Sequence, residues 1–232
     1  MPLYSCVFFD LDHTLWDYET NCKEALQELY HSYELKNFGV PSFDKFHNSF
    51  NVINTNLWDR YDRGEIHRDV IRFERFDRIL KEFGVDHYEM SLKLSDDYVN
   101  ESPKKKNLMP SAGIVLEYLS SKNYPMYIIT NGFDEIQSTK LQSSGIEKYF
   151  QEVVTSQKAG YKKPAKEIFH YALDKEGILS HQAIMIGDNL ITDIGGAKNA
   201  AIDAVYLNPT GVSHNENVTY EIRSLNELTT IL

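Results

Sequence analysis

The sequence predicts an α/β protein in which helices cover both faces of a parallel sheet and a helical bundle is inserted after the first strand. Short apolar runs alternate with helical segments over residues 105–232, a pattern typical of a parallel sheet. Four helical patterns follow one another between the first strand and residue 104, with no strand among them. We therefore expect a core of residues 1–16 and 105–232, and an inserted bundle of residues 17–104.

The first predicted strand, residues 6–9, ends directly in two carboxylates, Asp10 and Asp12, and a hydroxyl at Thr14. Residues two apart in an extended segment point to the same side, so both carboxylates should face one point beyond the strand, where open α/β sheets bind ligands. Two close carboxylates repel unless a cation joins them. Oxygen ligands suit Mg²⁺, which in turn prefers phosphate. A helix N-cap and turn pair is the alternative interpretation.

The inserted bundle is expected to hold four helices. Apolar residues at three- and four-residue spacing predict them over residues 20–35, 43–58, 70–83 and, with a weaker pattern, 88–98. Gly84 is a typical C-terminal signal for the third of them. The lysine-rich stretch 102–106 is interpreted as a solvated return linker rather than a phosphate-attracting patch.

The remainder of the chain alternates between the two kinds of element. Strands are predicted over residues 126–130, 152–155, 183–186 and 203–207. Helices are predicted over residues 111–122, 134–144 and 165–176, with a small-residue helix through 195–197. Ser224 and Glu227 form a capping-box pattern that opens a last short helix.

The later strands also end in polar residues. Thr130 and Asn131 offer a hydroxyl and an amide in a turn that could hold a phosphoryl group. Lys163, before a proline, could supply a point charge for phosphate and for a carboxylate. Asp188 and Asp193 follow another strand and add the acids that a metal site requires. Each alone has an ordinary interpretation as a turn or a solvated lysine, but the combination predicts metal-dependent phosphate chemistry.

Counting charges raises a hypothesis about Asp12. Four aspartates, one Mg²⁺ and one lysine leave one net negative charge, which a phosphate dianion would not enter comfortably. We therefore hypothesise that Asp12 binds a proton when substrate is bound and acts as the general acid for the leaving alcohol. A flat rate between about pH 5 and 9, or an unchanged profile in Asp12→Asn, would count against this.

Composition limits the classes of partner. The chain has 232 residues, of which 42% are hydrophobic, as in an ordinary globular protein. Its 24 basic and 34 acidic residues give a net charge of −10, which argues against a nucleic-acid-binding surface. Cys6 and Cys22 have no metal-binding spacing, and no apolar stretch is long enough for a membrane span. We expect a cytoplasmic monomer or weak dimer with a small-molecule substrate.

Four motifs carry a resemblance to a known family: DLDHT at residues 10–14, TNG from Thr130, KKP through Lys163, and GDNLITD through Asp188 and Asp193. In this order they resemble the haloacid dehalogenase superfamily of phosphohydrolases over the whole chain. The resemblance implies a Rossmann-like core with a helical cap, and a magnesium-dependent phosphatase. The dehalogenases of that superfamily lack the second acid of the first motif, so Asp12 argues for phosphate and against halide.

The resemblance also implies roles for these residues. Asp10 would be the nucleophile that forms an aspartyl-phosphate, and Asp12 the general acid and base. Thr130 would bind the phosphoryl group, while Lys163, rather than Lys162, would steady its charge. The ligands of Mg²⁺ would be Asp10, Asp188 and the backbone carbonyl of Asp12, with Asp193 supporting them. His13 departs from the small or amide residues frequent at its position; a structural role is favoured over contact with the leaving group.

A finer resemblance concerns substrate. The stretch ITNGFDEIQSTKLQSSGIEKYF together with KKPAKEIFHYAL is similar to the pyrimidine 5′-nucleotidase branch, which implies a nucleoside monophosphate substrate. A phosphatase for small sugar or glycolytic phosphates is one alternative. A non-enzymatic binding domain is another, although Asp10, Asp12, Lys163 and Asp188 are all present.

The cap would choose the substrate and exclude water. Five aromatic residues could stack on a base, although a packed core is the favoured interpretation for most of them: Trp16, Tyr18, Phe50, Trp58 and Tyr61. Arg68, Arg72 and Arg75 share one helical face and could reach a nucleotide. Because acidic residues lie nearby, we favour a salt-bridged solvent face for these arginines.

Overall fold

The computed structural model describes residues 3–232, which fold as two compact units. The core unit holds the chain up to Tyr18 and again from Lys106 to Leu232, and the cap unit is Glu19–Lys105. None of the helices within the described part of the chain is both long and apolar enough to cross a membrane.

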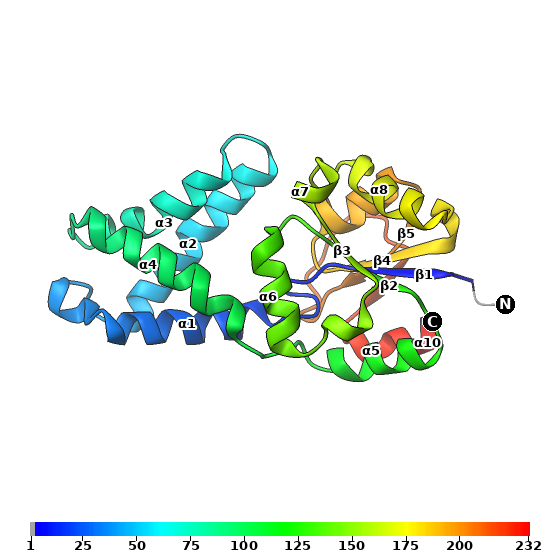
Figure 1. The fold of residues 1–232 in the computed structure, drawn as a ribbon, viewed down its shortest axis with the longest axis horizontal. Helices are drawn as coiled ribbons and strands as arrows, with labels where there is room; N and C mark the ends of the chain where they lie inside the picture. The colour runs from blue at the N-terminus through cyan, green and yellow to red at the C-terminus, as the bar shows by residue number, and fades with distance from the viewer. Residues whose placement is uncertain (1–2) are drawn as a thin grey trace. The chain divides into compact units, whose positions relative to one another are not determined.

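The core unit is built on one sheet of six parallel strands, ordered β3-β2-β1-β4-β5-β6 (Figure 1). The strands are β1 (Cys6–Phe9), β2 (Met126–Thr130), β3 (Glu152–Thr155), β4 (Ala183–Gly187), β5 (Asp203–Leu207) and β6 (Tyr220–Ile222). The first strand is central, with Phe9 paired to Ile128 on one side and Ile186 on the other. Because all strands run the same way, the residues after β1, β2 and β4 meet at one edge.

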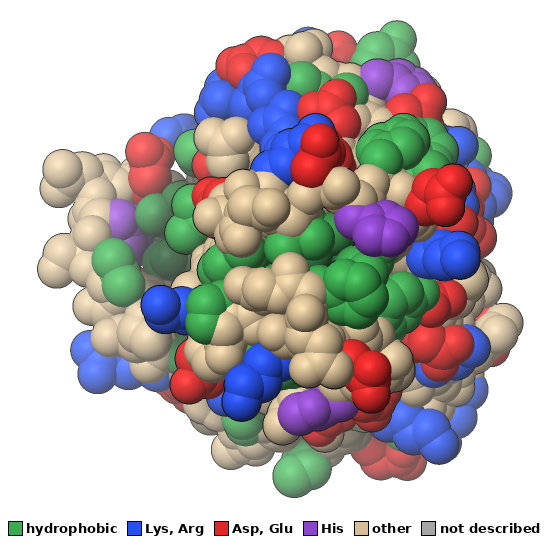
Figure 2. Space-filling view, turned by 90° about the vertical axis from the view of Figure 1, so that its left-hand side faces the viewer, with side chains coloured by type: hydrophobic (Ala, Val, Ile, Leu, Met, Phe, Trp, Pro, Cys, Tyr) green, Lys and Arg blue, Asp and Glu red, His purple; other side chains and the backbone are tan. Residues whose placement is uncertain are grey.

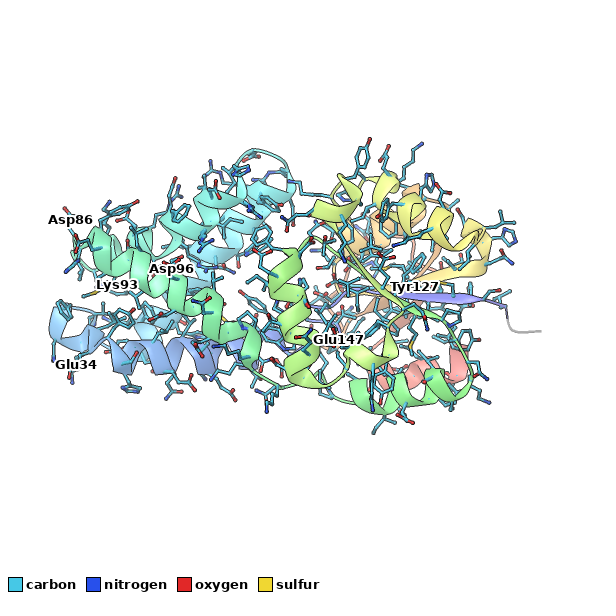
Figure 3. All side chains as sticks on the ribbon, in the orientation of Figure 1. Glu34, Asp86, Lys93, Asp96, Tyr127 and Glu147 are labelled. Carbon is cyan, nitrogen blue, oxygen red and sulfur yellow. The ribbon has the colours of Figure 1, made fainter. Side chains whose placement is uncertain are left out.

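Alternation along the central strand divides the core into two layers. Val7 and Phe9 belong to the cluster that includes α5 (Ala112–Ser121), α6 (Asp134–Ser144) and α10 (Leu228–Ile231). Cys6 and Phe8 belong to the opposite cluster, with α8 (Lys166–Glu176) and α9 (Gly196–Asn199). Tyr127, labelled in Figure 3, lies edge-on to Phe8 at 5.8 Å between ring centroids. The predicted α/β class with helices on both faces is therefore what forms.

The cap unit contains four helices: α1 (Tyr18–Ser32), α2 (Phe43–Asp62), α3 (Arg68–Glu82) and α4 (Tyr88–Glu101). A short 3-10 turn, η1 (Leu35–Phe38), follows the first helix, and η2 (Ser102–Lys104) follows the last. Its interior is aromatic, because Phe50 and Tyr98 lie 5.1 Å apart and Phe76 packs against both. The apolar spacing of the sequence predicted these buried faces correctly.

Several short elements were not predicted. They are β6, α7 (Ser156–Ala159), η3 (Glu147–Tyr149), η4 (Ser180–Gln182) and a π-helical turn, η5 (Leu190–Gly195). The sixth strand has three residues and only one of them, Ile222, is buried, so it carries no alternating apolar pattern. The expected final helix forms as η6 (Leu225–Glu227) continuing into α10, and its Ser224 capping box is present.

The lysine-rich stretch after α4 does not form a basic patch. Lys104 pairs with Glu101 at 2.7 Å, and Lys105 pairs with Glu28 at 2.5 Å. On the face drawn in Figure 2, acidic and basic side chains are likewise interspersed around a band of apolar ones. The lysines therefore do not gather as a phosphate-attracting patch, but the stretch is only partly solvated, because Ser102 and Pro103 are buried in η2.

Candidate active site

Three carboxylates meet at the carboxyl edge of the sheet. Asp10 follows β1, Asp188 follows β4, and Asp193 lies in η5; one carboxylate oxygen of each lies within 4.8 Å of the others. We call these three residues the acidic triad. A set of ligands made only of carboxylate oxygens suits a hard divalent cation.

Gly187 and Asn189 shape this part of the site. A Cβ atom at Gly187 would lie 2.3 Å from Oδ2 of Asp193, so only glycine lets that carboxylate approach the end of β4. The Asn189 backbone N–H donates to the same oxygen at 3.1 Å, and its side chain accepts from the N–H groups of Ile191 and Thr192. The GDN sequence therefore serves to hold Asp193 in place.

Lys163 joins two members of the triad. Its side chain is 3% exposed, and its ammonium donates to Asp10 and Asp193, each at 2.6 Å. Burial alone would lower the pKa of Lys163, but the charges of Asp10 and Asp193 outweigh burial and hold that pKa above its ordinary value. The lysine therefore stays charged.

Asn131 holds the loop that carries this lysine. Its amide oxygen accepts from the Lys163 backbone N–H at 2.8 Å, and its amide nitrogen donates to the Lys163 carbonyl at 3.0 Å. The sequence suggested a phosphate-binding amide here. The structure instead engages the side chain with backbone groups of the KKP segment, so the Asn131 amide positions the loop that carries Lys163.

One ammonium does not balance three carboxylates, of which Asp193 is fully buried and the other two largely so. Burial raises the pKa of Asp10 well above its ordinary value, and the charges of Asp193 and Asp188 add to this against the opposing effect of Lys163. Burial, followed by the charge of Asp193, raises the pKa of Asp188 to about 6, although the Thr14 hydroxyl donates to it at 3.0 Å. Positive charge is what the triad lacks, and a divalent cation would supply it. The residues present therefore fit Mg²⁺.

Thr130 is buried at the end of β2 with its hydroxyl oriented. Its oxygen accepts from the Gly132 N–H at 3.0 Å and from the Gln137 amide at 3.0 Å. A hydroxyl has two acceptor positions and one donor. With both acceptor positions used, the Thr130 proton is left to donate, as a phosphoryl oxygen would require.

Asp12 is held separately, by two residues that the sequence analysis missed. Lys140 on α6 donates to both of its carboxylate oxygens, at 2.6 and 2.8 Å, and Gln137 donates to one of them at 3.1 Å. Burial would raise the pKa of Asp12, but Lys140 outweighs it and lowers that pKa. The charge count made from the sequence was therefore incomplete, because adding Lys140 brings the site with Mg²⁺ to zero net charge.

A signal for these two residues was present in the sequence. Gln137 and Lys140 lie three residues apart in a helix that starts right after TNG, so they share the face turned toward the strand end. A glutamine and a lysine on the inner face of a core helix need polar partners, and Asp12 and Thr130 are the partners available.

His13 and Trp16 pack within the core unit. His13 has a left-handed backbone, φ 61°, and its ring lies 4.6 Å from that of Tyr18. Trp16 is fully buried, with the Lys140 ammonium 4.6 Å from its ring. Phe50 is buried inside the cap unit, as expected for a core residue. Trp58 and Tyr61 are only partly buried and form an edge-to-face pair at 5.5 Å.

The three cap arginines differ from one another. Arg72 forms a salt bridge of 3.1 Å with Asp96, which is labelled on α4 in Figure 3, and this matches the expected solvent face. That interpretation is wrong for Arg75, whose guanidinium is buried 4.5 Å from the Tyr98 ring and donates to Asn54 at 2.9 Å. The arginine face extends into the bundle interior, where the aromatic rings replace a carboxylate as the partner.

Comparison with known proteins now gives the class of this chain. Residues 7–207 match the sequence model described as haloacid dehalogenase-like hydrolase. The match spans most of the chain, so the chain belongs to this family of hydrolases. The family and the enzyme class expected from the four motifs are confirmed.

Individual relatives span nearly the same length. The HAD-hydrolase YfnB of Bacillus subtilis is 29% identical over 100% of this chain and 97% of its own. A crystal structure of YfnB bound to magnesium has a TM-score of 0.87 and covers 98% of both chains. The pyrimidine 5′-nucleotidases PynA of Streptococcus pneumoniae and YjjG of Escherichia coli are each 29% identical over 97% of this chain, and over 93% and 96% of their own.

Proposed function

We propose that the protein is a magnesium-dependent phosphomonoester hydrolase that works through an aspartyl-phosphate on Asp10. The observation that supports this most is the different surroundings of two carboxylates two residues apart. Asp10 lies in the acidic triad beside Lys163, whereas Asp12 is bonded by Lys140 and Gln137 of α6. Titratable groups whose environments push their pKa values apart are typical of divided acid–base and nucleophile roles.

The proposed reaction has two steps. A carboxylate oxygen of Asp10 attacks phosphorus, the bond from phosphorus to the ester oxygen breaks, and Asp12 delivers a proton to the departing alcohol. Water then attacks the phosphorus of the aspartyl-phosphate, Asp12 takes a proton from that water, and Asp10 is released. Thr130 and Lys163 would bind the phosphoryl oxygens through a hydroxyl donor and a positive charge.

The acidic triad would hold the magnesium ion, together with the backbone carbonyl of Asp12. The ion would neutralise the carboxylates and the phosphoryl oxygens, which is the main electrostatic need of phosphoryl transfer. Lys163 keeps Asp10 and Asp193 in place, and Thr14 orients Asp188 through its hydrogen bond.

We further infer a 5′-nucleotidase acting on pyrimidine nucleoside or deoxynucleoside monophosphates. The full-length similarity to two pyrimidine 5′-nucleotidases supports this substrate class. Substrate choice is assigned to the cap unit, where Trp58 and Tyr61 offer partly buried aromatic rings. The two cysteines, Cys6 and Cys22, are both buried, and this usage suits the cytoplasm, where small phosphomonoesters are available.

A substrate panel tests both parts of the proposal. Phosphate release with Mg²⁺ is measured for ribo- and deoxyribonucleoside monophosphates and for sugar phosphates, in the native protein and in Asp10→Asn. Preferred release from pyrimidine monophosphates, lost in the variant, is expected. Activity on sugar phosphates alone would keep the mechanism and remove the nucleotidase assignment, and full activity in Asp10→Asn would remove Asp10 as the nucleophile.

A further inference from the structure

Two donors from one helix hold the Asp12 side chain. Gln137 and Lys140 both lie on α6 and both are buried, at 0% and 6% exposure. Together they make three hydrogen bonds to the Asp12 carboxylate, two from the ammonium and one from the amide. A carboxylate bonded at both oxygens by groups on a packed helix has one orientation rather than several.

The Lys140 ammonium has two kinds of contact, a salt bridge and an aromatic ring. Its ammonium is bonded to one carboxylate, that of Asp12, and otherwise lies over the Trp16 ring. A buried lysine is expensive for a fold unless it is paired. The pair therefore holds both members in place.

Gln137 connects Asp12 to the phosphate-binding end of β2. Its amide nitrogen has two protons, and it donates to Asp12 at 3.1 Å and to Thr130 at 3.0 Å. The reverse orientation of the amide would put its oxygen against the carboxylate, so the orientation is fixed. Its oxygen is buried and has no hydrogen-bond partner among the described residues. Such a group costs stability, so the two donated bonds are what keep the amide in this position.

Gly132 leaves the room that this amide occupies. A Cβ atom at position 132 would lie 1.8 Å from the Gln137 amide nitrogen. The backbone at Gly132 does not have a positive φ, so the clash and not the conformation excludes a side chain. The glycine of the TNG motif is thus tied to Gln137.

We propose that Lys140 and Gln137 are positioning residues that aim the Asp12 carboxylate at the leaving group, with Gly132 providing the space for Gln137. This inference rests on the proposed phosphomonoesterase function. A positioning role predicts that loss of Lys140 or Gln137 affects substrates differently according to their leaving group. An alkoxide needs a proton to depart, whereas 4-nitrophenolate departs without one, so a misaimed Asp12 should slow the first step only for the first kind of substrate. The quantity that reports the first step is kcat/KM, because the second step, in which Asp12 takes a proton from water, is common to both kinds.

The test compares a nucleoside monophosphate with 4-nitrophenyl phosphate in Lys140→Met and Gln137→Ala. We expect kcat/KM for the nucleotide to fall by about 100-fold in Lys140→Met, which is the lower range for loss of general acid catalysis. For 4-nitrophenyl phosphate we expect kcat/KM to fall by less than about fivefold, whereas kcat falls for both substrates wherever their shared second step limits it. Lys140→Arg, which keeps a charged donor, should recover part of the nucleotide rate.

One exposed lysine and one exposed glutamine of the core unit serve as matched controls. Lys148 is exposed and also lies over an aromatic ring, that of Tyr149, at 4.9 Å. Gln142 is an exposed glutamine of α6 that donates to Glu147, labelled in Figure 3. Lys148→Met and Gln142→Ala should leave both substrates at the native rate.

A second experiment does not depend on activity. Gly132→Ala should lower the melting temperature, because its methyl group displaces Gln137, and Gly132→Ala combined with Gln137→Ala should recover most of that loss. An equal fall in kcat/KM for both substrates in Lys140→Met, or a rise in the nucleotide KM with kcat unchanged, would overturn the positioning role. A double variant no more stable than Gly132→Ala would overturn the link to Gly132. A native protein inactive on every phosphomonoester would instead remove the proposed function itself.

Discussion

Replacing Asp188 by asparagine should stabilise the metal-free protein while it removes metal-dependent activity. The pKa of this carboxyl is raised to about 6, mainly by burial and then by Asp193. An ordinary aspartate has a pKa near 3.9. At roughly 1.4 kcal/mol for each tenfold change in proton affinity, ionised Asp188 costs the folded protein about 3 kcal/mol relative to the unfolded chain.

The pH dependence of this cost has a definite sign. Because the folded pKa lies above the unfolded one, the cost is complete above about pH 6 and disappears below about pH 4. The metal-free native protein should therefore gain stability as the pH falls through this window, and Asp188→Asn should gain less, because only the contribution of Asp10 remains. The Thr14 hydroxyl, 3.0 Å from Oδ1 of Asp188, can still donate to an amide oxygen, so the substitution keeps that bond.

The assay is urea unfolding with a chelator present, at about pH 7 and pH 4. We expect Asp188→Asn to be more stable than native protein by about 2–3 kcal/mol at the higher pH and by nearly nothing at the lower one. Asp174→Asn, at an exposed position on α8, should change stability by less than about 0.5 kcal/mol at either pH.

The same unfolding assay is then repeated with Mg²⁺ in place of the chelator. Added Mg²⁺ should stabilise the native protein by mass action and have little effect on Asp188→Asn. A variant less stable than native protein at neutral pH, or a stability gain that does not depend on pH, would refute the reasoning that charge crowding strains the triad.

Three further substitutions test the supports of the site and the cap interior. Gly187→Ala puts a methyl group against an oxygen of the acidic triad, so we expect a loss of about 2 kcal/mol in thermal unfolding and about 100-fold in kcat. Asn131→Ala removes two bonds to the Lys163 backbone and should cost about 1–3 kcal/mol and a measurable part of kcat. Arg75→Ala should cost about 3 kcal/mol in urea unfolding, against less than about 1 kcal/mol for Arg72→Ala, since only Arg75 is buried.

The sequence predicted what depends on local pattern. Apolar runs of three to five residues indicated β1, β2, β4 and β5, because a buried parallel strand is apolar on both faces, whereas β3 has only two apolar residues and is half-buried. It also predicted that Asp10 and Asp188 meet, since strand-end residues of one parallel sheet share an edge. The sixth strand was missed because its three residues give no period to detect.

What the sequence could not give is the direction of individual side chains. The residue pattern alone does not separate the roles of Asp10 and Asp12, because alternation along a strand predicts only that both side chains face the same side. Which one meets Lys163 and which meets Lys140 depends on the placement of α6 against the end of β2, and that is a tertiary property. Arg75 was misjudged for a related reason, because three arginines at helical spacing do not tell where the buried face of the helix ends.

The proton that Asp12 gives to the leaving group must be supplied after the free enzyme has lost it. Lys140 lowers the pKa of Asp12 and brings the metal-loaded site to zero charge, so the free enzyme has Asp12 ionised near neutral pH. The proton must then enter with the substrate, as the monoanion of a phosphate ester, or be taken up when the substrate binds. By either route, the reactive complex carries one proton more than the ionised enzyme and the dianionic substrate carry separately.

The pH profile of kcat/KM measures this requirement. For a nucleoside monophosphate it should fall by about tenfold per pH unit above about pH 6, the second pKa of the phosphate group. For 4-nitrophenyl phosphate, whose leaving group needs no proton, the fall should be shallower, and Asp12→Asn should lose the difference between the two substrates. A nucleotide profile that stays flat from about pH 5 to 9 would mean that Asp12 does not supply this proton, and the role given to its two positioning residues would fail with it.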